Sequence, residues 1–450
     1  MSHRIIPATL LLLGLVASPV AQAETFGLEQ AQSYALEHNP DLLAAREQVT
    51  ASGARTRVAE GARLPSLGLS YSAQSSNNPL AAFAGKLNQR RVTTPDFDPA
   101  RLNHPGTTDL HATQLALRLP VYTGGRLSAS VTSAEEMEKT SRLQYERARE
   151  VTAFQTLRAY LNVQAAQEAL VIAEDAVKAA QEHARTTAQL SREGRIVVSD
   201  KLTAEVNLAA VQSQRAQAVT RLESARNQLK LVMGLPLEND IGVSSGTSSA
   251  VVSGTTGLTE IEARALANRK DLAAARAMHQ AVKARVQAAR AAHKPNINFI
   301  ATSDWYDDNP GFDSHSSSVM GVVSLDLYAG GRHQGEISAA LAEDREMERR
   351  VQSLEQTARN DVREAWENLR EAGARHATAA DNAERARENV RLVKQRYGQG
   401  RTILIDLLQA ERAYTDARNE ELISRLGLEV GQAALRLAEG TLPLPPETIP

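Results

Sequence analysis

Two short turns in this chain carry side chains that could act together. Each turn has a glycine six residues before an aspartate, and the second also has a tyrosine and an arginine nearby. A carboxylate, a phenol and a guanidinium can join in a polar network. Aspartates that face one narrow axis would favour cations and disfavour their own full ionisation. The residues concerned are Asp200, Tyr397, Arg401 and Asp406, with Gly194 and Gly400 in the turns.

Each of these residues also has an ordinary structural interpretation. Asp200 follows Ser199 at the start of a predicted helix, and Asp406 comes in the first turn after Thr402. A carboxylate near a helix N-terminus contributes about 0.3–1 kcal/mol of stability. Tyr397 could simply pack in its turn. From the residues alone, the polar network and helix capping both stay open.

Patterns typical of enzymes are missing. There is no G-x-S-x-G, P-loop or G-x-G-x-x-G motif, and no cysteine. The ten histidines are scattered, without the spacing of zinc ligands. A net charge of −2 and the lack of a basic block argue against a nucleic-acid partner. The sequence therefore predicts a protein without catalysis, cofactor, metal or nucleic acid.

One octet occurs twice, at 119–126 and at 325–332, and both copies end in Tyr-x-Gly-Gly-Arg. An alternating segment precedes each copy, and a very long segment without proline follows it. We expect a strand to meet a helix at each octet. The glycines would bend the chain there, because a residue without a Cβ adopts backbone angles that other residues avoid. They are not a phosphate-binding loop, since no Lys-Ser/Thr follows them. These joint residues are Gly124, Gly125, Gly330 and Gly331.

Strands are predicted before each joint. Apolar and polar residues alternate over 115–121 and 319–327, which gives each strand one apolar face. A strand of about ten residues fits a tilted membrane strand, although a sheet on a soluble core shows the same pattern. We expect one β-pair over 64–122 and another over 295–329. The long polar segment 77–109 is predicted to be a loop.

Long helices are predicted after each joint. As helices, 126–192 and 332–398 would each be about 100 Å long. Two shorter helices, 29–62 and 199–232, together match one long helix, so they are expected to lie end to end beside it. Alanine-rich stripes with few large residues indicate the wall of a hollow helical tube.

The expected organisation is a signal peptide followed by two structural repeats. Residues 1–23 have a positive start, an apolar run and an A-x-A site. The predicted divisions are a signal peptide 1–23, a first repeat 24–234 with a helical hairpin 126–234, a linker or equatorial segment 235–257, a second repeat 258–440 with a hairpin 332–438, and a flexible tail 441–450. The linker is expected to form a small belt with the C-terminal residues.

This duplicated layout resembles the TolC family of outer-membrane efflux and secretion channels. The resemblance rests on Asn39-Pro-Asp-Leu42, on the two Tyr-x-Gly-Gly-Arg joints, on Arg396-Tyr-x-x-Gly400 and on Asp406-Leu-Leu-x-Ala410. It implies a mainly α fold with a membrane β-barrel. The duplicated long helices would form an α-barrel, and four strands per chain would build a twelve-stranded barrel in a homotrimer.

The resemblance also implies a function. The chain would be the passive exit duct of a tripartite export system, in the cell outer membrane and extending into the periplasm. Its partners would be a periplasmic adaptor (membrane fusion) protein and an inner-membrane pump of RND, ABC or MFS type. The alternative is a periplasmic coiled-coil adaptor or scaffold without a pore, which would not need two strand pairs. The cargo stays open.

The resemblance implies in addition a closed periplasmic tip. Asp200 and Tyr397 match a pair in the family's tip network, and Asp406 matches an aspartate of a constricting ring. Two positions depart from the family pattern. Thr402 stands where the family has an arginine, with Arg401 one position earlier, and Gln409 replaces a second acidic residue.

Overall fold

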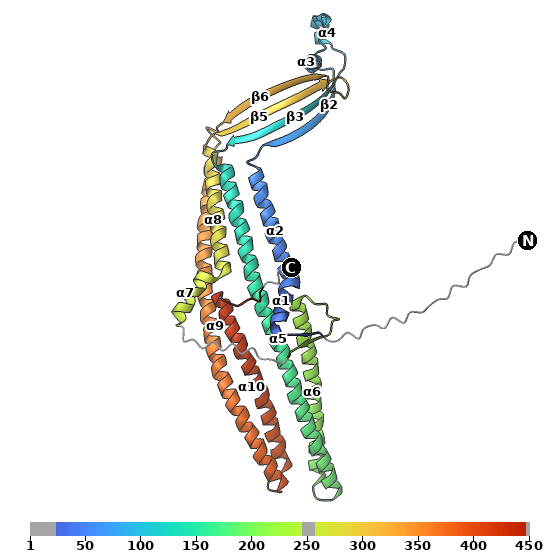
Figure 1. The fold of residues 1–450 in the computed structure, drawn as a ribbon, viewed down its shortest axis with the longest axis vertical. Coiled ribbons are helices and arrows are strands. Elements are labelled where there is room, and N and C mark those ends of the chain that lie inside the picture. The colour runs from blue at the N-terminus through green and yellow to red at the C-terminus, as the bar shows by residue number, and fades with distance from the viewer. Residues whose placement is uncertain (1–23, 245–256, 447–450) are drawn as a thin grey trace, which may run out of the picture.

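The computed structural model describes residues 24–244 and 257–446 as a long rod that carries a small β-sheet at one end (Figure 1). The predicted signal peptide 1–23 lies outside the described residues. Two helices run most of the rod's length: α5, Arg126–Arg192, and α9, Arg332–Gly398, each of 67 residues. The prediction of two very long helices is confirmed.

Shorter helices flank the long ones in two levels. Next to the sheet lie α2, Pro40–Gly61, and α8, Lys270–Arg290; beyond the middle of the rod α6, Val198–Met233, and α10, Leu404–Glu439, continue to its far end (Figure 1). Alanine and other small residues fill much of the buried face of α5, such as Ala153, Thr156 and Ala159. Small side chains let neighbouring helices approach closely, and alanine loses no side-chain entropy in a helix.

The middle of the rod holds an apolar core around Tyr160. The strands β1, Glu24–Phe26, and β4, Ile241–Val243, pair in parallel beside it. The Tyr160 hydroxyl lies 3.2 Å from the Phe26 carbonyl oxygen and 3.1 Å from that of Ser244. The linker strand β4 pairs with the N-terminal strand, whereas linker residues 245–256 lie outside the described residues, so the belt with the C-terminal residues stays a prediction.

Each opening helix is broken in two near this level. In the predicted segment 29–62 the break falls at Asn39-Pro-Asp41, which the sequence shows as an interruption near the start of that segment. In the first half α1, Leu28–His38, ends before Asn39, which accepts a hydrogen bond from the Leu42 amide at 3.0 Å and donates to the Val232 carbonyl at 2.8 Å. Pro40 then starts α2, because proline has no N–H and suits the first helical position.

The second half breaks without a proline. Here α7, Leu258–Asn268, ends before Arg269, whose side chain is 5% exposed. Its guanidinium pairs with Asp271 and with Asp361 of α9, both at 2.8 Å. A buried arginine thus replaces the Asn39 cap at the equivalent place. Buried charge is tolerated there because two carboxylates pair with it.

The sheet has four antiparallel strands in the order β2-β3-β5-β6. They are β2, Ser66–Ser76, β3, Thr108–Tyr122, β5, Asn296–Asp307, and β6, Ser314–Ser324. Leu67 pairs with Leu117, and Leu117 with Ala301, so one face of the sheet is apolar. The predicted alternation to residue 327 is too long: β6 ends at Ser324, and Leu327 is 90% exposed outside any strand. Both outer strands, β2 and β6, have one edge without a partner in the described chain.

The connection between β2 and β3 is folded, contrary to the predicted loop. It contains α3, Pro79–Asn88, a 3-10 turn η1, Thr94–Phe97, and α4, Pro99–Asn103. Proline stands at the first helical position of α3 and α4, directly after the capping residues Asn78 and Asp98. Prolines at first helical positions start helices instead of breaking them.

None of the helices in the described ranges combines the length and the hydropathy that a transmembrane span requires.

Two glycines with similar backbones provide a test of the contact at the middle of the rod. Gly234, with φ 76°, follows α6 and lies against His38, where an added Cβ would be 2.4 Å from the carbonyl oxygen. Gly194, with φ 70°, faces open space. Gly194→Ala should cost about 1–2 kcal/mol from backbone strain alone. Gly234→Ala should cost about 1–3 kcal/mol more through overpacking. Denaturant unfolding followed by circular dichroism measures both, and equal losses would contradict the contact.

Arg269 predicts a pH dependence of stability. Burial alone would raise the pKa of Asp271, but the hydrogen bond and charge of Arg269 outweigh burial and lower it. The unfolded chain therefore takes up this proton at a higher pH than the folded chain. The stabilisation is fully present above the ordinary pKa and is lost as pH falls through the lowered one. Arg269→Met should cost about 3 kcal/mol at neutral pH, and the loss should shrink below about pH 4.

Arg276 is the matched control for this experiment. It lies on the same helix, α8, and pairs with Glu355 at 2.8 Å, but its side chain is 45% exposed. Arg276→Met should cost under about 1 kcal/mol. Equal losses for the two variants, or a loss for Arg269→Met that is the same at every pH, would contradict the role given to the Arg269 ion pairs.

Candidate functional site

The far end of the rod consists of two tight turns, one in each hairpin (Figure 1). Gly194 and Gly400, with φ of 70° and 68°, follow the long helices. The Arg195 amide donates back to the Leu190 carbonyl at 2.9 Å, and the Arg401 amide donates to that of Arg396 at 2.9 Å. Glycine suits these turns because its left-handed backbone satisfies the last helical carbonyls without a Cβ clash. The two hairpins thus end in matching turns.

Tyr397 and Asp200 come from different hairpins but lie close together. Tyr397 belongs to the last turn of α9, is half-buried and packs against Ala204 of α6 and Leu404 and Leu408 of α10. Burial raises the pKa of its phenol, and the negative charge of Asp200 raises it further. Tyr397 therefore packs where α9 of one hairpin meets α6 of the other, near enough to Asp200 for that charge to act on the phenol.

Asp406 and Arg401 are arranged differently. Asp406 is exposed in the first turn of α10, and the Thr402 hydroxyl donates a hydrogen bond to its carboxylate. Within the described ranges the exposed Arg401 side chain forms no hydrogen bond or ion pair. Gln409 is also exposed. In a single chain, then, the Asp406 carboxylate bonds to Thr402 in the turn before α10, and neither Asp406 nor Arg401 forms a hydrogen bond or ion pair with Tyr397 or Asp200 within the described ranges.

A ladder of charged pairs joins the two halves above the tip, and the sequence analysis missed it. On α5 and α10, which run antiparallel, Glu168 pairs with Arg425 at 2.6 Å and Asp175 with Arg418 at 3.1 Å. His183 Nε2 lies 2.8 Å from Glu411 one step further. Acidic residues seven apart on one helix, facing arginines seven apart on another, were the available signal, since seven residues span two helical turns.

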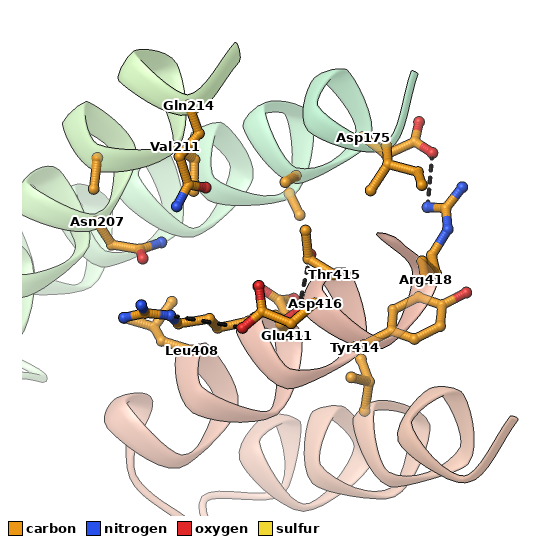
Figure 2. Close-up of a pocket in the computed structure, with 16 residues that line it drawn as sticks. Asp175, Asn207, Val211, Gln214, Leu408, Glu411, Tyr414, Thr415, Asp416 and Arg418 are labelled. Atoms are coloured by element: carbon orange, nitrogen blue, oxygen red, sulfur yellow. Dashed lines mark hydrogen bonds and ion pairs between the residues drawn. The ribbon is translucent and has the colours of Figure 1, made fainter. Parts of the chain in front are cut away.

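A groove lies beside this ladder, between α6 and α10 and over α5 (Figure 2). Its volume is about 420 Å³. Val211 and Gln214 line it from α6, Asp175 from α5, and Tyr414 and Arg418 from α10. Figure 2 shows the Asp175–Arg418 pair at one end of the groove. The lining is both apolar and charged, as in surfaces that bind proteins.

In the part of the chain that the structure describes, no three histidine, aspartate or glutamate side chains are arranged to hold a metal ion.

A family model described as "Outer membrane efflux protein" matches residues 32–235 and 263–441, well over half of the chain. The chain belongs to the outer membrane efflux protein family. Both matched ranges contain the same plan of broken helix, strand pair and long hairpin. The predicted resemblance is therefore confirmed.

Relatives and solved structures agree with the family. The chain is 22% identical over 409 residues to the proteases secretion protein PrtF of Dickeya chrysanthemi, covering 88% of this chain and 84% of PrtF. It is 26% identical over 439 residues to the protein CyaE of Bordetella pertussis, covering 94% and 86%. Among solved structures, the CmeC outer membrane channel of Campylobacter jejuni has a TM-score of 0.80 at 17% identity, covering 98% of this chain and 94% of CmeC. At that identity the structural likeness shows the fold.

Family membership confirms the predicted function and location. The chain is an outer-membrane efflux or secretion channel that extends into the periplasm. The comparisons give no support to the alternative of a pore-less periplasmic adaptor. Members of the family are channel proteins that work with partner export systems.

The contact at the tip can be tested by titrating Tyr397. Asp200→Asn removes a negative charge near the phenol, so the pKa of Tyr397 should fall toward its ordinary value. The absorbance difference between each protein and its Tyr397→Phe counterpart isolates this one tyrosine. Glu205→Gln, further along α6, should leave the midpoint unchanged. A midpoint that does not move in Asp200→Asn would show that the two residues are not adjacent.

Proposed function

We propose that this chain is the passive exit duct of a tripartite export system and works as a homotrimer. The observation that carries the proposal is the pair of open sheet edges on β2 and β6. Within a membrane every backbone N–H and C=O needs a partner. Three copies joined edge to edge would give one closed twelve-stranded barrel, and their hairpins would line a tunnel below it.

The two halves of the chain would be structural repeats, each of which contributes two strands and one helical hairpin. The proposed divisions are a signal peptide 1–23, repeats 24–234 and 258–440, a linker 235–257 and a tail 441–450. The glycine joints support this reading. Gly124 and Gly125 have φ of 65° and 92°, and Gly330 and Gly331 have φ of 60° and 83°. Such backbones redirect the chain immediately before the first residue of each long helix.

The partners would be a periplasmic adaptor and an inner-membrane pump of RND, ABC or MFS type. The groove beside the α5–α10 ladder suits the adaptor, because it lies on the hairpins and combines apolar and charged walls (Figure 2). PrtF is named for secretion of proteases, and BepC of Brucella suis for efflux. Polypeptides and small compounds are therefore both reasonable cargo. The pump would supply the energy, and the duct would need no catalytic group or cofactor.

The tip would act as the gate. Tyr397 of one hairpin packs against Ala204 of the other and lies within the electrostatic reach of Asp200, so this tip packing would hold the hairpins together. Arg401 is exposed and has no partner in the described part of its own chain, which leaves it available to a neighbouring copy. Asp406 is exposed on the same turn. Three Asp406 carboxylates around one axis would repel each other and attract cations.

Asp406→Ala tests this gate in planar lipid bilayers. The wild-type trimer should conduct ions with low conductance and a preference for cations. Without the three carboxylates, and without the Thr402 contact, the variant should show at least a several-fold higher single-channel conductance and a weaker cation preference. Gln409→Ala removes a neutral exposed side chain from the same helix and should change little.

Two results would count against these proposals. Currents that are the same in Asp406→Ala and wild type would remove Asp406 from the gate. A purified protein that never conducts ions across a bilayer would contradict the duct itself.

A further inference from the structure

The folded connection between β2 and β3, residues 77–107, lies at the end of the sheet away from the helices (Figure 1). We call it the exit cap. It comprises α3, η1 and α4. The inner face of α3 packs on β3: Ala82 is buried, and Gly85 lies next to Thr108 and Leu110. The exit cap is therefore a structured body on the outer end of the sheet.

Three consecutive residues fasten the exit cap to the β5–β6 turn. Gln89 is 5% exposed, and its amide donates to the carbonyls of Asp109 at 2.6 Å and Asp307 at 3.0 Å. Its own carbonyl accepts from the Ser314 hydroxyl at 2.8 Å. The buried Gln89 amide fixes the position of the cap relative to β3 and the β5–β6 turn, because a buried polar group that loses its hydrogen-bond partner destabilises the fold.

The next two residues extend this attachment. Arg90 has a φ of 58°, which is unusual for a residue with a Cβ, and donates to the His315 carbonyl at 2.7 Å. Arg91 forms an ion pair with Asp308 in the turn. The strained backbone of Arg90 is kept because its neighbours are fixed on both sides. The exit cap cannot swing freely from its two ends.

This attachment brings the exit cap close to both edges of the sheet. The cap begins directly after β2, one edge strand, and bonds to Ser314 and His315 at the start of β6, the other edge strand. In a closed ring of copies, each of these edges meets a different neighbour. The exit cap therefore borders both neighbouring copies.

An apolar surface of the exit cap is left uncovered. Leu80 and Leu87 are 79% and 57% exposed, and they lie seven residues apart on one face of α3. Phe97 is 61% exposed and packs edge-on against Phe83, with ring centroids 5.7 Å apart. Three large apolar side chains exposed together on one small body are typical of a contact surface.

We propose that the three exit caps of the trimer bind one another through Leu80, Leu87 and Phe97 and so narrow the outer opening of the duct. The occupant of this surface is a second copy of the same chain. The cap adjoins β2 and β6, the two strands whose edges lack partners, so a second copy that pairs with either strand would lie next to the cap. The inference rests on the proposed trimer.

The absence of cysteine from the chain makes a direct test possible. Leu80→Cys and Phe97→Cys replace exposed side chains; Leu80→Cys should leave the fold unchanged, and Phe97→Cys removes only the edge-on contact with Phe83. In the assembled trimer a short bismaleimide should link such cysteines into covalent dimers and trimers. Labelling by a water-soluble maleimide should be at least several-fold slower than in dissociated chains. Asn103→Cys, an exposed polar position in the same cap, is the control and should label freely without linking.

The possible results distinguish the contact between exit caps from the proposed trimeric duct. Trimers that conduct ions, but whose Leu80→Cys and Phe97→Cys label as fast as Asn103→Cys and do not link, would overturn the cap contact alone. Fluorophores at these two cysteines that are quenched by lipid-borne quenchers would overturn it too, because the surface would then face the membrane. Protein that neither forms trimers nor conducts would overturn both proposals.

Discussion

The two unpaired edges of the four-stranded sheet are the constraint on which the whole account depends. A membrane offers no water to the N–H and C=O groups of β2 and β6, so another strand must satisfy them. One chain cannot close its own sheet, because four strands are too few for a barrel. Copies that share a barrel in this way would also bring their hairpins together around the same axis.

The two halves follow one plan with different chemistry. Asn39 caps a helix where Arg269 binds two carboxylates, and a Cβ on Gly124 would lie 2.7 Å from Lys294 Cβ whereas one on Gly330 would meet open space. Two such halves need not move alike. The α5–α10 ladder joins them through partly exposed pairs, each worth about 0.2–1 kcal/mol. Several weak ion pairs along α5 and α10 can align the two hairpins, and each pair costs little to break if the hairpins separate.

The sequence predicted what depends on local patterns. The lack of proline and glycine in 126–192 predicted α5 to the residue, and alternation predicted β3 because one of its faces is apolar. The repeated octet located both joints. Contacts between distant segments were not predictable in this way. The buried Arg269 that follows α7 is paired with Asp361 of α9, which is 92 residues away in the sequence. Likewise β4 pairs with the N-terminal strand, although the sequence of neither segment indicates this pairing.

Other misses came from ambiguous signals. The segment 77–109 is polar and rich in proline, which favours a loop, yet Pro79 and Pro99 each follow a capping residue and start a helix. At the tip, the turn glycines were evident, but the proximity of Tyr397 to Asp200 depends on how two hairpins pack. Asp406 shows why one chain is not enough: the only hydrogen-bond partner of its carboxylate among the described residues is Thr402, and the proposed ring would form only between copies.

The most direct test of the account is the mass of the purified particle. Native mass spectrometry of the detergent-solubilised protein, after removal of the detergent in the instrument, counts the chains in each assembly. A barrel closed by three copies should appear as a single species of three chains that persists until the protein unfolds, because opening one edge pair would expose backbone groups on two copies. A folded, stable single chain would contradict it, since such a chain would have satisfied its sheet edges without a neighbour.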